Sequence, residues 1–258
     1  MTMPLAIALL LLAAALPGHA MQCSAQSGER TAAFVELYTS EGCSSCPPAD
    51  RWLSGLGAQG GVPERIVPLA LHVDYWDYIG WKDPYAKREF SLRQRKLTQL
   101  QRLALVYTPQ VMLQGRDFRG WGTPAFEEAV AKINAQPAKA HIELAIRGAK
   151  AAGLNVEAQA RLLDRAQHEQ AALYLAAYQN RLVSKVDAGE NRGRILAHDY
   201  VVLEWQGPFG FGADGRLAQR RELPLLPRAS AGESGVVAFV QNRRSAEVLQ
   251  ALMLPACP

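Results

Sequence analysis

The feature that most limits how this chain can fold is a pair of cysteines separated by two residues, Cys43 and Cys46. An apolar run at 33–38 precedes the pair and predicts a buried strand, and the stretch 47–56 can form a helix. One helical turn brings the two sulfurs within bonding distance, and the free N–H groups of that turn favour a thiolate on the first cysteine. The layout therefore predicts a dithiol redox site, with Cys43 as the nucleophile and Cys46 as the resolving thiol.

The first 20 residues have the composition of an export signal. An uninterrupted apolar run at 5–16 is followed by small residues at Gly18 and Ala20, the positions expected before a cut after Ala20. The run is shorter than the roughly 20 residues that a membrane-spanning helix needs. We therefore expect a signal peptide at 1–20 and a periplasmic or secreted mature protein.

Export would place all 4 cysteines in an oxidising compartment, where disulfides are commoner than zinc sites. Proximity favours a bond between Cys43 and Cys46, which leaves Cys23 and Cys257, one near each end of the mature chain. We expect these two to form a structural disulfide. The alternative is that they stay free or pair with another molecule.

The remaining patterns divide the chain in two. Predicted strands at 33–38, 66–73 and 106–113 alternate with predicted helices at 47–56, 84–104 and 123–136. Later segments alternate apolar and polar residues between Gly, Asp and Asn turns, which predicts short strands at 141–146, 154–160, 172–178, 200–205 and 236–240. We therefore expect an α/β domain over 31–137, followed by a small antiparallel β-sandwich domain over 139–254.

The cysteine pair at a strand-to-helix junction, followed later by Thr108-Pro109 entering a strand, resembles the thioredoxin superfamily. The longer stretch 35–50, together with 72–77, is similar to a family of secreted bacterial proteins described as domain of unknown function 1223. The resemblance implies a thioredoxin-like fold for the first domain. It also implies that Pro109 is cis and lies against the dithiol, and that the Thr108 backbone offers an edge to a substrate chain.

Glu36 is the unusual residue of the first strand, because a carboxylate in a central strand is costly unless it has a partner. By the same resemblance, Glu36 would be the acid that shuttles the proton of the resolving cysteine. The alternative is a structural carboxylate. Substrate binding is expected from a segment that follows the second strand at the dithiol edge of the sheet, although its aromatic rings are as well suited to packing. This segment comprises Asp74, Tyr75, Trp76 and Asp77.

The formal net charge is +4, and much of the excess lies in and around one predicted helix. The basic residues there are Lys82, Lys87, Arg88, Arg93, Arg95, Lys96 and Arg102. Such a face is either simply solvated or contacts an acidic partner or lipid headgroups. We expect no nucleic-acid partner, because a basic helix alone is weak support for one in an exported protein.

The preferred function is an exported thiol–disulfide oxidoreductase that acts on protein thiols or disulfides of the cell envelope, with no bound cofactor. One alternative is a non-enzymatic envelope binding or assembly protein in which the Cys43–Cys46 bond only braces its loop. Another is a copper(I) carrier that holds the metal with Cys43, Cys46 and His72. The histidines show no metal-binding spacing, and the sequence contains no phosphate-binding loop.

Overall fold

The computed structural model describes residues 23–150, 153–226 and 232–257. The expected signal peptide, 1–20, lies outside these residues. In the part of the chain described, no helix is both long enough and apolar enough to cross a membrane.

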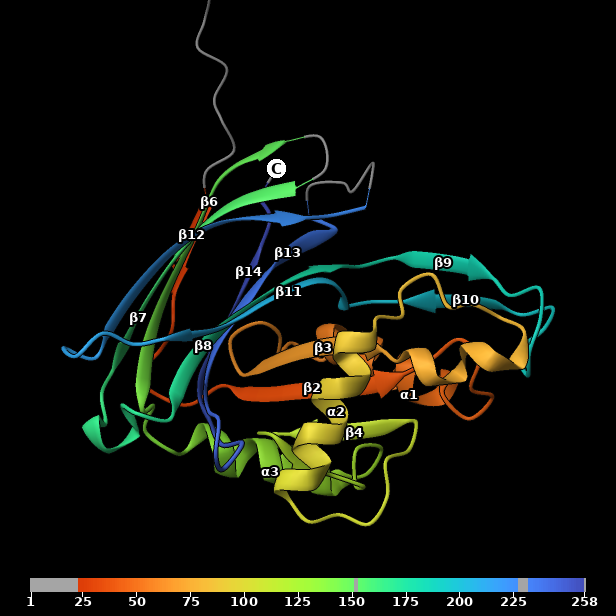
Figure 1. Cartoon of the computed structure of the whole chain (residues 1–258), viewed down its shortest axis with the longest axis horizontal. Coiled ribbons are helices and arrows are strands. Elements are labelled where there is room, and N and C mark those ends of the chain that lie inside the picture. Colours follow the sequence, from red (N-terminus) through yellow and green to blue (C-terminus); the bar gives the residue numbers. More distant parts are fainter. Residues whose placement is uncertain (1–22, 151–152, 227–231, 258) are drawn as a thin grey trace, which may run out of the picture.

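The centre of the molecule is an 8-stranded mixed sheet with the strand order β14-β13-β8-β11-β3-β2-β4-β5 (Figure 1). Its strands are β2 (Ala33–Thr39), β3 (Ile66–His72), β4 (Gln110–Leu113), β5 (Arg116–Asp117), β8 (Ala171–Gln179), β11 (Val201–Gly210), β13 (Ser234–Asn242) and β14 (Val248–Pro255). β2 and β3 are parallel and buried along their whole length, as their continuous apolar sequences predict. Their carboxyl ends meet at one edge of the sheet, and this edge carries the cysteine pair.

Among the described residues, three α-helices and two short 3-10 helices accompany the strands. They are α1 (Pro47–Ala58), η1 (Asp74–Ile79), α2 (Arg88–Leu100), α3 (Pro124–Asn134) and η2 (Arg165–Gln167). α1 begins with two prolines, which the first helical turn tolerates because its N–H groups have no intrahelical acceptor. α2 starts later than expected because the Asp83 carboxylate accepts the Tyr85 N–H at 2.9 Å and holds the residues before the helix in a turn. It also ends earlier than residue 104, where Arg102 has a positive φ of 54°.

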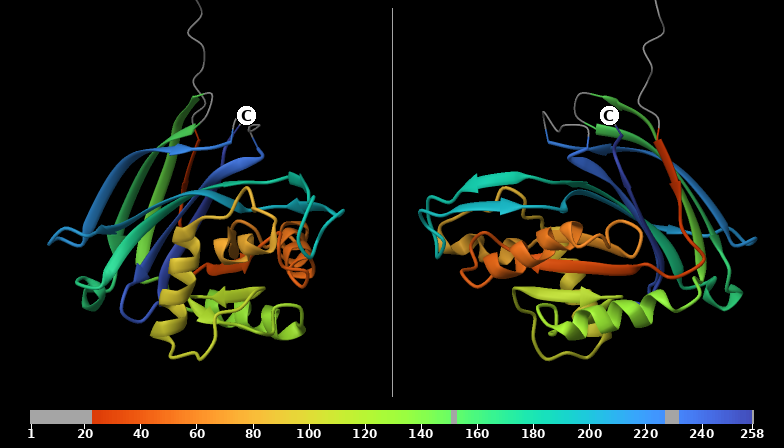
Figure 2. Two further views of the ribbon diagram at one scale, coloured as in Figure 1. Left: turned by 45° about the vertical axis from the view of Figure 1, so that its right-hand side comes forward. Right: turned by 180° about the vertical axis from the view of Figure 1, so that it is seen from behind.

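A second, antiparallel sheet of 4 strands packs over the C-terminal strands of the main sheet (Figures 1 and 2). Its order is β1-β6-β7-β12, from β1 (Cys23–Gln26), β6 (Ala140–Lys150), β7 (Gly153–Leu162) and β12 (Arg216–Pro224). Alternate residues of β6 and β7, such as Ile142 and Val156, face a hydrophobic core shared with Leu173 and Val240 of the main sheet. The 4-stranded sheet and the C-terminal strands of the main sheet thus form two packed layers.

The structure differs from the expectation in how the two halves of the chain join. The sandwich does not stand apart, because β11 lies parallel to β3 and the Ala70 N–H donates to the Tyr200 carbonyl oxygen at 2.8 Å. The strands of both halves therefore form one continuous sheet over a common core cluster. The division into 31–137 and 139–254 as domains stays a prediction.

A two-stranded hairpin, which we call the arm, connects β8 to β11 and extends over α1 and η1 (Figures 1 and 2). It consists of β9 (Leu182–Lys185), β10 (Ile195–His198) and a tip at 186–194. One face of the arm is buried, whereas Val183 and Ile195 on the other face are 62% and 72% exposed. The sequence patterns predicted no such hairpin.

Candidate functional site

Cys43 and Cys46 form a disulfide at the amino end of α1, with their α-carbons 5.4 Å apart. The Cys46 N–H donates to the Cys43 carbonyl oxygen at 3.2 Å, and the Asp50 N–H donates to the Cys46 carbonyl oxygen at 3.1 Å. Ser44 and Ser45 between the cysteines are exposed, but both cysteines are 0% exposed. The disulfide therefore lies just beneath the surface.

Trp76 covers one side of the loop that carries the disulfide. A β-carbon added to Gly42 would lie 3.1 Å from the Trp76 β-carbon, so the tryptophan packs directly on this backbone. The Trp76 indole N–H donates to the Thr108 hydroxyl oxygen at 2.7 Å, and the Thr108–Pro109 peptide bond is cis. Trp76 thus connects the dithiol loop to the proline segment named by the thioredoxin resemblance.

The other residues of the predicted substrate segment are half-buried and bonded to their own surroundings. The Asp74 N–H donates to the Ser91 hydroxyl oxygen at 3.1 Å, and the Tyr75 hydroxyl donates to the Gln94 side-chain oxygen at 3.2 Å. The Asp77 carboxylate accepts the Asp83 N–H at 3.3 Å. These contacts fix the segment against α2 and the loop before it, and they bring Trp76 to the dithiol.

Glu36 of β2 forms an ion pair with Arg93 of α2. Its carboxylate accepts from the Arg93 side chain at 2.5 and 3.1 Å and from the Tyr38 hydroxyl at 3.1 Å. The Arg93 guanidinium also lies 4.5 Å from the Trp205 ring centroid and 5.2 Å from that of Phe239. Burial lowers the pKa of Arg93, but the Glu36 carboxylate more than offsets this, so the net pKa is raised. The partners of Glu36 are those of a structural carboxylate.

Five buried titratable side chains surround the base of the dithiol loop, and we call them the buried polar cluster. They are Glu41, Asp50, His72, Asp83 and His198, each at most 6% exposed. The His72 Nδ1 lies 2.7 Å from the Asp83 carboxylate, and the His198 Nε2 lies 3.1 Å from the Glu41 carboxylate. The two imidazole rings are 4.9 Å apart, which joins both pairs into one cluster.

Asp50 is the member of the cluster without an ion-pair partner among the described residues, and the Thr39 side chain lies close enough to hydrogen-bond to its carboxyl. Burial raises the pKa of Asp50, and the nearby His198 and His72, together with a hydrogen bond from Thr39, only partly offset this effect. Burial lowers the pKa of His72, but Asp83 more than offsets it, so the net pKa of His72 is raised and that of Asp83 is lowered. Asp50 is thus held toward its protonated form, one helical turn after Cys46.

Sequence reasoning named His72 and the acidic Glu41 next to the cysteine loop, but it assigned no site role to Asp50, Asp83 or His198. For Asp50 a signal was present, because residues four apart on a helix share a face and Asp50 follows Cys46 by that spacing. His198 comes from the arm, and no local pattern connects it to the cysteines. Within residues 23–150, 153–226 and 232–257, no group of three or more His, Cys, Asp or Glu side chains is arranged to hold a metal ion.

A second disulfide joins Cys23 in β1 to Cys257 after β14, with α-carbons 6.0 Å apart. It ties the start of the second sheet to the end of the main sheet. Disulfides persist in oxidising compartments and are rare in the cytosol. The two bonds therefore indicate an extracytoplasmic protein.

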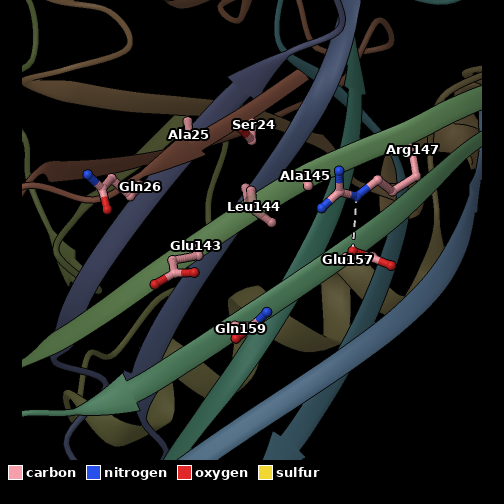
Figure 3. Close-up of a pocket in the computed structure, with 9 residues that line it drawn as sticks. All are labelled: Ser24, Ala25, Gln26, Glu143, Leu144, Ala145, Arg147, Glu157 and Gln159. Carbon is pink, nitrogen blue, oxygen red and sulfur yellow. Dashed lines mark hydrogen bonds and ion pairs between the residues drawn. The ribbon is translucent and has the colours of Figure 1, made fainter. Parts of the chain in front are cut away.

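A shallow hollow of about 430 Å³ lies elsewhere, on the outer face of β1, β6 and β7 (Figure 3). Its side chains are mostly polar, and an ion pair of 3.0 Å between Arg147 and Glu157 crosses it. The strands β6 and β7 lie on the other side of the molecule from α1 (Figure 1). The hollow is therefore separate from the dithiol.

Two solved structures are similar to this chain over most of its length. A structural-genomics protein from Agrobacterium tumefaciens matches with a TM-score of 0.63 and 25% identity, covering 89% of this chain and 96% of that one. HBP35 of Porphyromonas gingivalis matches with a TM-score of 0.66 and 18% identity, covering 90% of this chain and 78% of that one. These matches confirm the thioredoxin-like fold.

Among curated proteins, none matches the sequence of this chain. One family model matches residues 34–241, a span that includes the cysteine pair, the buried polar cluster and the arm. The chain therefore belongs to the family described as "Protein of unknown function (DUF1223)".

Proposed function

We propose that this protein is a periplasmic or secreted thiol–disulfide oxidoreductase with Cys43 and Cys46 as its reactive pair. The observation that carries the proposal is the Asp50 carboxyl, which is 6% exposed, has no ion-pair partner among the described residues and lies one helical turn after Cys46. Burying such a group costs stability, and perturbed carboxyls in this kind of setting are commoner at reactive sites than elsewhere. Its place one turn after Cys46 suits proton transfer with the resolving thiol.

The reaction would proceed by thiol–disulfide exchange. The Cys43 thiolate attacks one sulfur of a substrate disulfide, a bond forms between them, and the other substrate sulfur leaves as a thiolate. The Cys46 thiolate then attacks the Cys43 sulfur, which re-forms the Cys43–Cys46 bond and releases the second substrate thiol. Two electrons pass from the protein to the substrate, and the reverse sequence oxidises a substrate dithiol.

Asp50 would handle the proton of Cys46 in both directions. When the Cys43–Cys46 bond is opened by a substrate thiolate, Cys46 leaves as a thiolate and takes a proton from the Asp50 carboxyl. When the bond re-forms, the Asp50 carboxylate accepts that proton from the Cys46 thiol. Because burial raises the pKa of Asp50, its protonated form is more available for the first step than that of an exposed carboxyl.

The substrates would be protein thiols or disulfides of the cell envelope. By the thioredoxin resemblance, an extended substrate segment would approach the dithiol along the Thr108 backbone, and Trp76, which packs on the dithiol loop and bonds to Thr108, would line that path. On α2, Arg88, Arg95 and Lys96 are exposed and remain available for an acidic partner or a membrane surface, whereas Arg93 is held by Glu36.

A structural brace is the second candidate function of the disulfide, because Cys43 is 0% exposed. Against it, the loop is already held by the Cys46-to-Cys43 backbone hydrogen bond. A disulfide that closes so short a loop also adds little by chain entropy.

The two candidates differ in the behaviour of single cysteine variants. With oxidised glutathione as the substrate, Cys46→Ser should accumulate a mixed disulfide at Cys43 that mass spectrometry detects, whereas Cys43→Ser should form none at Cys46. In each variant the Cys23–Cys257 bond serves as the internal control for folding. Full exchange activity in either variant would contradict the proposed mechanism.

A further inference from the structure

The arm tip is bonded to the loop that carries the dithiol. The Asn191 side-chain amide donates to the carbonyl oxygens of Glu41 at 2.8 Å and Cys43 at 2.9 Å, and Asn191 is 0% exposed. Gly189 has a positive φ of 72°, and a β-carbon there would lie 3.1 Å from Ile79 of η1. The tip is therefore packed closely over the dithiol from a part of the chain far away in sequence.

Glu190 makes the contact that bears on chemistry. Its exposed carboxylate accepts the Ser44 N–H at 3.0 Å, and hydrogen bonds from the Ser44 side chain and backbone hold the pKa of Glu190 below its ordinary value. The Ser44 amide belongs to the peptide group that immediately follows Cys43. Pro47 and Pro48 supply no N–H, and the Cys46 N–H is bonded to the Cys43 carbonyl oxygen. Glu190 thus occupies one of the few donors near the Cys43 sulfur.

A carboxylate in this position disfavours a thiolate on Cys43 for two reasons. The two anions repel each other, and they compete for the same backbone donor. The Ser45 hydroxyl, 3.4 Å from the Cys43 sulfur, remains as a donor to a thiolate. By thermodynamic reciprocity, a contact that disfavours the thiolate must itself be weakened when the thiolate forms.

We propose that the arm tip is a redox-linked strap: Glu190 and Asn191 hold it closed over the oxidised pair, and reduction of Cys43 loosens it. This inference rests on the proposed function. It adds that Glu190 lowers the stability of the Cys43 thiolate and that the arm tip controls the access of a substrate to Cys43. With the tip closed, Cys43 is 0% exposed. A protein thiol or disulfide would therefore react at Cys43 after the tip has moved.

The chain offers a matched pair of variants to test the role of Glu190. Glu190→Gln and Asp187→Asn each remove one negative charge from the exposed tip, but only Glu190 bonds to the dithiol loop among the described contacts, since Asp187 pairs with Lys185 at 4.0 Å. The full chain is reduced with dithiothreitol, and the rate of Cys43 alkylation by iodoacetamide is followed by mass spectrometry. We expect Glu190→Gln to raise the rate about two- to fivefold, the effect of one exposed charge at a helix N-terminus.

A change of the same size should appear in the equilibrium constant for reduction of the Cys43–Cys46 bond by glutathione. In that reaction two glutathione thiols become one glutathione disulfide while the Cys43–Cys46 bond becomes two thiols. We expect Glu190→Gln to favour the reduced pair by about two- to fivefold. Asp187→Asn should stay at the wild-type value in both assays. Equal shifts in the two variants, or no shift in Glu190→Gln, would overturn the proposal.

Hydrogen exchange provides a measurement that depends on no variant. The tip amides of Val186 and Gly193, which bond across the hairpin, should exchange faster in the reduced wild-type protein than in the oxidised one. Identical exchange in the two states would overturn the strap. If instead the wild-type pair fails to exchange with glutathione, the proposed function fails, and alkylation of the dithiothreitol-reduced protein still tests the strap separately.

Discussion

Arg93→Met should destabilise the protein strongly, because it leaves the Glu36 carboxylate buried without its cation. The side chains of Glu36 and Arg93 are 0% and 12% exposed, and after the change Glu36 would keep only the Tyr38 hydroxyl of its described partners. Removing one partner of a buried ion pair costs about 3–5 kcal/mol. The loss of the guanidinium over Trp205 acts in the same direction, whereas the methionine retains much of the apolar stem.

The assay is urea unfolding followed by tryptophan fluorescence and by far-ultraviolet circular dichroism. We expect the free energy of unfolding to fall by about 3–5 kcal/mol in Arg93→Met. The matched control is Arg95→Met on the same helix, where the arginine is exposed and the change should stay within about 0.5 kcal/mol. The double variant Glu36→Gln/Arg93→Met should lose less stability than the two single variants together, by about 0.5–3 kcal/mol.

Two results would refute this reasoning about Glu36. One is an Arg93→Met variant whose stability is close to that of Arg95→Met, because the buried pair would then contribute little. The other is a Glu36→Gln variant that keeps its stability but loses disulfide exchange. That result would restore Glu36 as the acid that serves the resolving cysteine.

Three further predictions follow from the described contacts. Because burial raises the pKa of Asp50, its carboxyl costs the fold stability once the pH exceeds the unfolded pKa; Asp50→Asn should therefore raise the free energy of unfolding at pH 8 while slowing disulfide exchange at least about tenfold. The raised pKa of His72 beside Asp83 means that their pair contributes fully below about pH 6.5 and is lost as the pH rises through the folded pKa. His72→Gln should accordingly flatten the fall of Tm above that pH. Replacing both Cys23 and Cys257 by serine should lower the free energy of unfolding by about 2–5 kcal/mol, measured by urea unfolding.

Local patterns predicted the part of the fold that holds the cysteines. The continuous apolar runs gave β2 and β3, and the prolines after Cys46 marked the start of α1. The family resemblance and the thioredoxin-like fold are confirmed. These features depend on residues close together in the sequence.

The sequence patterns did not show which strands lie side by side, and they did not show β12, the edge strand of the second sheet. Alternation shows which face of a strand is buried, but it does not show which strand lies beside it, so the pairing of β11 with β3 was missed. β12 was missed because its residues Arg220, Arg221 and Glu222 are charged and exposed, which hides the period of a strand.

The candidate site combines residues that are close together in the sequence with residues that come from a distant segment. Cys43, Cys46 and Asp50 lie within one segment, and their helical spacing was readable. Asn191 and His198 reach the site from the arm, where the sequence contains no pattern that specifies contact with the dithiol loop. The thioredoxin resemblance pointed to Glu36, but the buried carboxyl without an ion-pair partner among the described residues that lies one helical turn after Cys46 is that of Asp50.

The most direct test of the redox assignment is the equilibrium potential of the Cys43–Cys46 pair against glutathione. It would be measured on the mature protein, with the state of each cysteine mapped by mass spectrometry so that the Cys23–Cys257 bond is followed separately. We predict a value between about −120 and −270 mV, the range of catalytic dithiols. A value below about −300 mV would contradict the account and make the disulfide a structural brace.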